Sequence, residues 1–358
     1  MTEFSKSATN FEALPYLCPH SHTRLKYNGE NLLSDDGKYT YPIHNGIPSF
    51  LRYEPAESID LTEKLERLNE QAKSKGWLEA VKDIYSSEPG SIKYITDKSR
   101  SIFLDLIPLT PNSNVLEIGP GLGQFTGLIA SKVNQVYALE VVKGQAQFVK
   151  EHCRQIKANN VEVACGGDDC MLPYHDQTFD VVILNLVFEW CGTREASGSH
   201  TDAQLRLIRE VHRVLKPNGA LYLATKNRYA LRYLLGKSDE HAYNMRFGNA
   251  LPRWLMHLFL KLKGKNRAAG FLYSHNHLRR ILLNQRFTCI RSFWAAPEIR
   301  FPERLIPTDN KSIREARSAG GLQQGDIRSV RLLMPLLPSF LVKHFTPGLV
   351  FLAFKGDV

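Results

Sequence analysis

Glycines and carboxylates meet at the end of an apolar run near the first third of the chain. Residues 119–123 read Gly-Pro-Gly-Leu-Gly directly after the apolar run 115–118, which contains Glu117. Glycine lets the backbone turn sharply and approach a ligand closely. The helical spacing of residues 124–130 places unpaired N–H groups at the same corner, where they favour a carboxylate or phosphate. The pattern predicts a strand, a tight loop and a helix that together bind a nucleotide-like ligand.

The spacing of the glycines narrows the choice of ligand. A dinucleotide fingerprint would place its third glycine at position 124, whereas this chain has Gln124 and carries the third glycine at 123. This spacing favours S-adenosylmethionine over a nicotinamide dinucleotide. Glu140 ends the next apolar run, 136–140, where a carboxylate can accept hydrogen bonds from a ribose diol. The alternative for Glu140 is a solvated acid at a strand end.

A third acidic corner precedes a nearly continuous apolar strand. Asp168 and Asp169 follow Gly167, and residues 178–185 then read as a strand of a parallel sheet covered on both faces. The Asp168 carboxylate can accept a hydrogen bond from an adenine amino group, and the Asp169 backbone N–H can meet a ring nitrogen. Residues 214–219 next end a helix and lead into the strand 220–225.

In this order, the motifs resemble those of class I S-adenosylmethionine-dependent methyltransferases over about residues 100 to 230. The resemblance implies an α/β fold with a doubly wound, mostly parallel seven-stranded sheet, and S-adenosylmethionine as the cofactor. By resemblance, Glu117 with Gly119, Gly121 and Gly123 holds the methionyl end, Glu140 the ribose, and Asp168 and Asp169 the adenine. Asn185, Leu186 and Val187 would line the floor beside the reactive methyl group.

A hydroxyl acceptor needs a base, because the neutral oxygen is a poor nucleophile in an in-line displacement. His241 is the first candidate, since histidine titrates near pH 6.5. Glu189 and His275 are further candidates for the base. Glu189 follows the end of the fourth strand and directly precedes Trp190. The competing interpretation is a surface histidine for His241 and a solvated acid for Glu189. No spacing of carboxylates and histidines calls for a catalytic metal.

The N-terminal segment, residues 1–57, has short strand and turn patterns from Leu14 onward. Its closing residues, 41–48, resemble those of the zinc-ribbon-like activator subunit of tRNA and protein methyltransferases. A structural zinc needs four Cys or His ligands in two close pairs, and no thiol or imidazole occurs at 34–37. We therefore expect a ribbon that has lost its zinc and that gains stability by docking on the core. The alternative is a metal site formed by four side chains: Cys18, His20, His22 and His44.

The rest of the chain divides into three further parts. Residues 58–92 read as a helical connector or cap, residues 93–235 with 281–358 as the methyltransferase core, and residues 236–280 as a basic lid insertion. Residues 227–241 and 296–302 resemble a subgroup of bacterial methyltransferases of glycan and secondary-metabolite assembly. An amphipathic stretch at 252–262 is expected to form a lid or to touch a membrane.

The charge of the chain indicates which kinds of partner it can bind. The net charge is +10, and residues 231–280 carry ten Lys or Arg against two acids. Such a segment can meet nucleic acid, an anionic membrane surface or a phosphorylated substrate, or it can be a solvated face. The six cysteines lack paired spacing and fit reduced thiols. With no apolar run of about twenty residues and no secretory signal, a cytoplasmic protein is expected.

Three functions remain open on the sequence. The first is methylation of a hydroxyl on a small molecule or glycan, which the subgroup resemblance favours. The second is methylation of RNA, which the basic segment and the N-terminal unit favour. The Asn/Asp-Pro-Pro-aromatic motif for exocyclic base amines is missing, because Leu186, Val187 and Phe188 follow Asn185. The third is a module that binds the cofactor without catalysis.

Overall fold

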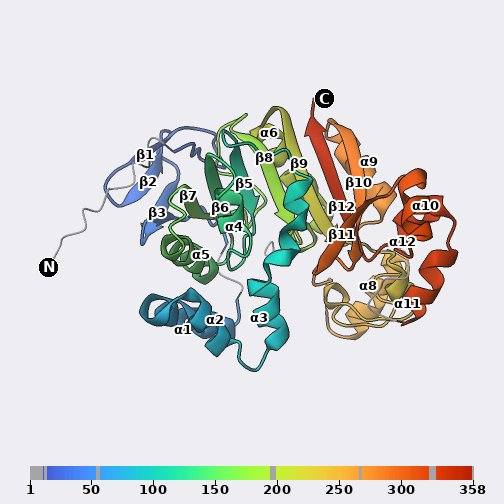
Figure 1. The fold of residues 1–358 in the computed structure, drawn as a ribbon. Helices are drawn as coiled ribbons and strands as arrows, with labels where there is room; N and C mark the ends of the chain where they lie inside the picture. The colour runs from blue at the N-terminus through green and yellow to red at the C-terminus, as the bar shows by residue number, and fades with distance from the viewer. Residues whose placement is uncertain are drawn as a thin grey trace.

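A computed structural model of the chain describes residues 11, 14–53, 57–193, 199–265, 268–321 and 328–356. Within these, one sheet of eight strands runs through the centre of the molecule (Figure 1). In spatial order the strands are β11 (Pro302–Pro307), β10 (Phe287–Pro297), β12 (Gly348–Lys355), β9 (Leu215–Lys226), β8 (Phe179–Asn185), β5 (Asn114–Ile118), β6 (Gln135–Glu140) and β7 (Val161–Cys165).

The expected count of seven strands is wrong, because β11 adds an eighth strand at one edge. The run from β9 to β7 is parallel throughout, with four parallel pairings. The pairings of β12 with β9, β10 with β12 and β11 with β10 are antiparallel. Strand β10 extends past Phe293 to Pro297, and the chain turns back so that β11 pairs with this extension. The sequence gives no signal that this strand continues past Phe293, so its partner β11 was not expected.

Helices cover both faces of the sheet, as the doubly wound class requires. Alternate residues of the parallel strands belong to two different cores: Leu116 and Val182 face one side, and Val115 and Val181 the other. The first core is closed by α6 (His200–Val214) and α9 (His275–Asn284), and the second by η2 (Lys98–Asp105) and α4 (Thr126–Ala130). Burial on both faces explains why these strands read as continuous apolar runs.

The N-terminal unit is a small antiparallel sheet that docks on the β7 edge. Its strands are β1 (Leu25–Tyr27), β2 (Asn31–Ser34), β3 (Thr40–His44) and β4 (Ile47–Pro48). The Phe50 N–H donates to the Cys165 carbonyl at 2.8 Å, so the chain after β4 runs beside the end of β7. Figure 1 shows this unit in blue at one end of the main sheet.

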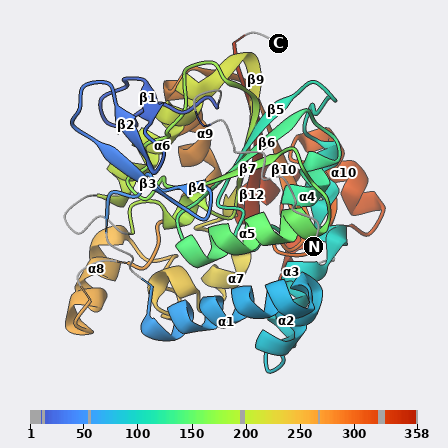
Figure 2. The ribbon, with the colours of Figure 1, turned by 90° about the vertical axis from the view of Figure 1, so that its left-hand side faces the viewer.

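The helical connector covers α5 (Lys143–Gln155). Helix α1 (Ile59–Lys75) and helix α2 (Trp77–Ile84) meet at Gly76, whose φ of 97° ends the first helix. The apolar positions of α1 pack beside α5, where Asn69 donates to the Gly144 carbonyl at 2.9 Å (Figure 2). The next segment forms two helices, α3 (Pro89–Thr96) and η2, because Asp97 is extended and caps η2.

One of the remaining elements, η3 (Phe188–Trp190), follows β8, and the others follow β9. These others are α7 (Leu231–Leu234), η4 (Glu240–Ala242), α8 (Arg253–Leu262), α10 (Asn310–Ser318), α11 (Arg328–Leu333), η5 (Met334–Leu336) and α12 (Ser339–Phe345). Helix α10 begins after Asp309, whose side chain caps it by accepting two backbone N–H groups. No helix in the described part of the chain has the length and apolar character to cross a membrane.

Candidate functional site

A cavity of about 740 Å³ opens at the carboxyl ends of β5, β6, β8 and β9. The glycine turn after β5 forms one wall. Gly119 has φ of 70°, and a Cβ there would lie only 2.4 Å from Cγ2 of Val187. A side chain would therefore clash with the floor of the cavity, which is the physical reason for glycine at this position.

Glu140 is held at the rim by backbone donors. Its carboxylate accepts hydrogen bonds from the N–H groups of Gly121 at 2.9 Å, Val141 at 2.8 Å and Val142 at 3.1 Å. These donors favour the ionised form and fix its orientation toward the glycine turn. Strand β6 thus supplies a fixed anionic acceptor where a ribose diol is expected.

Glu117 lies deeper in the same cavity and is almost fully buried. Burial raises its pKa to about 7, although a hydrogen bond from the Thr126 hydroxyl at 2.7 Å opposes the shift. A carboxyl group that changes charge near neutral pH responds strongly to a cationic ligand. This fits the ammonium group of a methionyl moiety.

A smaller cavity of about 100 Å³ adjoins the first and shares Gly119, Val187 and Trp190 with it. Its wall includes Asp168, at the predicted adenine end. The Asp168 carboxylate already accepts backbone N–H groups of Arg52, at 3.0 and 3.2 Å, and of Tyr53, at 2.8 Å. The N-terminal unit therefore holds this corner of the site.

The structure brings most of the predicted cofactor residues together. Six of them line the larger cavity, namely Glu117, Gly119, Gly121, Glu140, Asn185 and Leu186. Two do not face either cavity. Gly123 packs against Val149 and His152 of α5, and Asp169 lines a separate cavity beneath the N-terminal unit, where burial raises its pKa to about 6. Neither residue is among those that line the two cavities. The role predicted for Asp169 belongs to its backbone N–H and stays a prediction.

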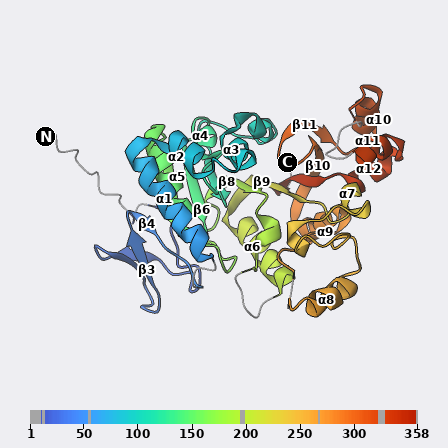
Figure 3. The same ribbon diagram turned by 90° about the horizontal axis from the view of Figure 1, so that it is seen from below.

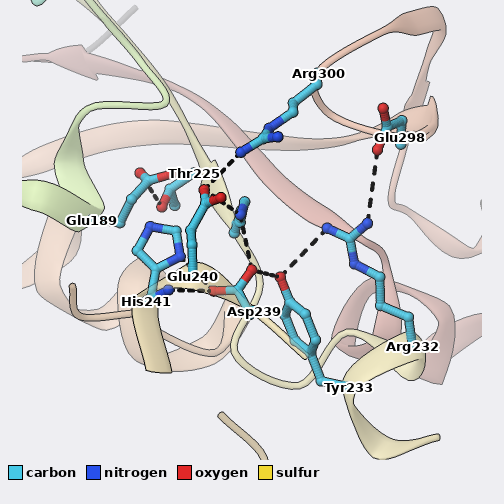
Figure 4. A network of polar contacts seen from close by, with 10 residues as sticks. Glu189, Thr225, Arg232, Tyr233, Asp239, Glu240, His241, Glu298 and Arg300 are labelled. Carbon is cyan, nitrogen blue, oxygen red and sulfur yellow. Dashed lines mark hydrogen bonds and ion pairs between the residues drawn. The ribbon is translucent and has the colours of Figure 1, made fainter. Parts of the chain in front are cut away.

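Of the three predicted bases, Glu189 is the one that lines the large cavity. It is 1% exposed, accepts a hydrogen bond from the Thr225 hydroxyl at 2.8 Å, and has its pKa raised by burial. His241 lies beside Glu189 (Figure 4) but is not among the residues that line the cavity, and its ring centroid is 4.3 Å from that of Trp190. Nδ1 of His241 is 2.5 Å from Oδ1 of Asp239, and its buried Nε2 has no hydrogen-bond partner among the described residues.

His275 is not part of this site. It lines a different cavity, next to β10, and its Nε2 is 3.0 Å from the Ser292 hydroxyl. Burial lowers its pKa to about 4, so the ring is neutral at physiological pH. The sequence places His275 near the start of a helix, but it does not indicate which face of the sheet that helix covers.

A network of charged residues lies beside the cavity, and the sequence analysis did not predict it. Lys226, the last residue of β9, pairs with Asp239 at 2.9 Å and with Glu240 at 2.8 Å, and Arg300 pairs with Glu240 at 2.7 Å. Burial opposes the charge of Asp239, but His241 and Lys226 outweigh it and hold its pKa well below the usual range. The available signal was the position of Lys226 at a strand end, where the crevice of a doubly wound sheet lies.

Several cations of the basic segment are used inside the protein. Arg232 is buried and lies 3.7 Å from Glu298, and Arg253 donates to the Leu272 carbonyl at 2.9 Å and stacks on Phe271. The exposed cations of the segment are therefore fewer than the sequence count, and this weakens the case for a broad phosphate-tracking surface.

The N-terminal unit has a hydrogen-bonded thiol at the first expected zinc position. Cys18 Sγ lies 3.1 Å from the Tyr41 hydroxyl and accepts the Ser21 N–H at 3.3 Å. His20 faces Asp169 at 3.7 Å. Across the residues that the structure describes, no three His, Cys, Asp or Glu side chains gather closely enough to hold a metal ion.

Comparison with known proteins gives a family match for the central part of the chain. Residues 116–223 match the family described as "Methyltransferase domain". A malonyl-[acyl-carrier protein] O-methyltransferase of Methylococcus capsulatus is 30% identical over 117 residues, which cover 32% of this chain and 38% of that protein. The biotin biosynthesis bifunctional protein BioHC of Cellvibrio japonicus is 30% identical over 123 residues, 34% of this chain and 22% of that protein.

Solved structures with similar folds are more distant in sequence. The [4+2]-cyclase SpnF is 15% identical with a TM-score of 0.43, and the match covers 73% of this chain and 81% of that chain. A SAM-dependent methyltransferase from Aquifex aeolicus is 21% identical with a TM-score of 0.33, covering 52% and 87%. The chain spans less than half the length of the two curated relatives named above.

Proposed function

We propose that this chain, whose residues 116–223 form a methyltransferase domain of the S-adenosylmethionine-dependent type, methylates a hydroxyl group of a small molecule or glycan intermediate. The observation that carries the proposal is Glu189, a buried carboxyl group with a raised pKa that lines the same cavity as the glycine turn and Glu140. A base is required for a hydroxyl acceptor, and Glu189 supplies one at the acceptor end.

The residues fit the cofactor. Glu117 and Glu140 offer carboxylates to its ammonium and ribose hydroxyls, and Asp168 lines the adjoining cavity where the adenine belongs. When bound, S-adenosylmethionine would supply an electrophilic methyl group on a sulfonium, with the neutral thioether as the leaving group of an in-line displacement. Asn185, Leu186 and Glu189 line the same cavity as these cofactor residues, so an acceptor in that cavity would lie near Glu189.

The protein's part in the reaction is to position the acceptor and to take its proton. Glu189 would take the proton of the acceptor hydroxyl, so that the acceptor oxygen becomes nucleophilic enough to accept the methyl group that the cofactor supplies. Asp239 holds His241 by its Nδ1, and His241 in turn lies beside Glu189. We assign His241 a positioning role beside Glu189, because His241 is not among the residues that line the cavity and its charge favours the ionised form of Glu189.

The test compares Glu189→Gln with the wild-type chain. Transfer of a labelled methyl group is measured on a panel of sugars, phenols, polyols and total RNA, and cofactor binding is measured by calorimetry. We expect turnover on a hydroxylated acceptor to fall at least about a hundredfold while cofactor affinity changes less than about twofold. Glu162→Gln is the matched control, because Glu162 also has a pKa raised by burial but lies on β7, away from the cavity.

Two outcomes would contradict the proposal. Methylation of RNA alone would favour the alternative acceptor. Tight cofactor binding with no transfer to any member of the panel would favour a binding module without catalysis.

A further inference from the structure

Helix α8 leaves an apolar stripe uncovered. Trp254 is 70% exposed, Leu258 is 50% exposed and Leu262 is 76% exposed. They lie four residues apart, so they form one line along the helix. On the opposite side, Met256 and Leu260 are buried against the protein. The helix therefore packs through one face and presents a second apolar face to solvent, which monomeric proteins rarely do without a partner.

Positive charge surrounds this stripe. Lys261, Lys263 and Lys265 are exposed at the C-terminal end of α8, and the Lys265 ammonium lies 5.1 Å from the ring centre of Tyr243. The sequence from 241 to 297 contains no Asp or Glu at all, while it contains ten Lys or Arg. No acidic side chain of this stretch can neutralise the lysines around the stripe.

The segment that bears α8 begins and ends at the candidate site. The Gly270 N–H donates to the His241 carbonyl at 3.3 Å, and the Phe271 N–H donates to the Glu189 carbonyl at 2.8 Å. Figures 2 and 3 show α8 at a corner of the molecule, away from the core of the sheet. The exposed stripe is thus on a projecting element whose two ends are fixed beside the cavity.

We propose that the α8 face, defined by Trp254, Leu258, Leu262 and the three lysines, docks on a membrane surface that contains anionic lipids. A short helix with an apolar stripe and flanking lysines lies in the membrane interface with the stripe inserted. Tryptophan favours this interface, and lysines near an anionic surface add attraction. This inference does not depend on the identity of the methyl acceptor.

Two other occupants fit the face less well. Nucleic acid would use the lysines, but its phosphate backbone has no use for three large exposed apolar side chains. A second copy of the chain paired across a two-fold axis would bring the same lysines together on both sides, where they repel. An anionic lipid surface satisfies the apolar stripe and the lysines at once.

The experiment measures co-sedimentation of the full chain with vesicles of phosphatidylcholine alone and of phosphatidylcholine mixed with phosphatidylglycerol. We expect binding to the mixed vesicles to be at least about tenfold tighter. The double variant Trp254→Ser with Leu262→Ser is expected to lose at least about tenfold in affinity. Replacing the three lysines by glutamine is expected to lose about a hundredfold.

Leu336→Ser is the matched control, because Leu336 is 77% exposed but lies on η5. It should bind as the wild type does, and circular dichroism should show that all variants fold. The proposal is overturned if both vesicle types bind equally, or if Leu336→Ser loses as much affinity as the double variant. It is also overturned if RNA competes fully with the vesicles, or if the stripe instead mediates a dimer that the double variant abolishes in sedimentation velocity.

Discussion

Glu117 links cofactor binding to pH. Burial raises its pKa to about 7, so the carboxyl group of the free protein is partly protonated at neutral pH. A ligand that brings an ammonium group next to it favours the ionised form. Binding then releases a proton, and the affinity must rise as pH increases through the pKa of the free protein.

We expect the affinity for S-adenosylmethionine to rise about tenfold between pH 6 and pH 8, because a carboxyl group with a pKa near 7 passes from mostly protonated to mostly ionised over that range. Titration calorimetry in buffers with different ionisation heats measures both the affinity and the proton release. Glu117→Gln should bind more weakly and lose this pH dependence. The control Glu162→Gln should keep it, and an affinity that falls with rising pH would remove Glu117 from the methionyl end.

For individual residues, the sequence predicts a functional role where the signal comes from neighbouring positions in the chain. Glu117, Glu140 and the glycines follow strand ends at fixed spacing, and the structure places them around one cavity. Lys226, Glu240 and Arg300 come from three separate segments, and only the tertiary fold brings them into one network. His241 was chosen for its chemistry, but no sequence pattern predicted that its ring would lie against that of Trp190 and outside the lining of the cavity.

Among the elements, the stretch after β4 has a role beyond packing. Residues 49–53 run along the end of β7, and two of their backbone N–H groups bind the Asp168 carboxylate. The acidic corner predicted for adenine is thus held from the N-terminal side. Cofactor binding and the position of the N-terminal unit should therefore depend on the same side chain.

Asp168→Asn tests this link. The amide keeps the size of the side chain but loses the charge that strengthens the hydrogen bonds from Arg52 and Tyr53. We expect the amide hydrogens of these two residues to exchange at least about tenfold faster, and cofactor affinity to fall. Asp36→Asn is the control, because Asp36 is an exposed residue whose partners, Ser21, Ser34 and Lys38, all lie within the N-terminal unit. Unchanged exchange in Asp168→Asn would show that the contact contributes little.

Element boundaries show where sequence periodicity fails. The parallel strands were predictable because they are buried on both faces and read as apolar runs. Strand β7 was not predicted, since Glu162 interrupts its short apolar run. Strand β11 was not predicted because only Pro302 and Ile306 of this edge strand are buried. The split between α3 and η2 depends on the backbone at Asp97, which apolar spacing does not report.

For the whole molecule, the N-terminal unit and the methyltransferase core share one hydrophobic core. Phe50 and Tyr41 of the unit belong to the same buried cluster as Leu116 and Tyr137 of the main sheet. The ring centroids of Phe50 and Tyr41 are 4.9 Å apart. The Cβ atom of Phe50 lies so close to Gly166, after β7, that it would touch any side chain added there. A unit of this size buries too little surface to be stable alone. It should therefore unfold together with the core.

Phe50→Ala tests this cooperativity. Removing a side chain that is only 2% exposed is expected to lower the free energy of unfolding of the whole chain by about 3–5 kcal/mol. Scanning calorimetry should show one transition that moves to lower temperature. Tyr27→Ala, in the same unit but at a position 38% exposed, should cost less than about 1 kcal/mol. A separate early transition in Phe50→Ala, with the main transition unmoved, would mean that the core is stable without the unit. In that case the contacts of Arg52 and Tyr53 with Asp168 would form and break while the cavity wall beside them stays folded.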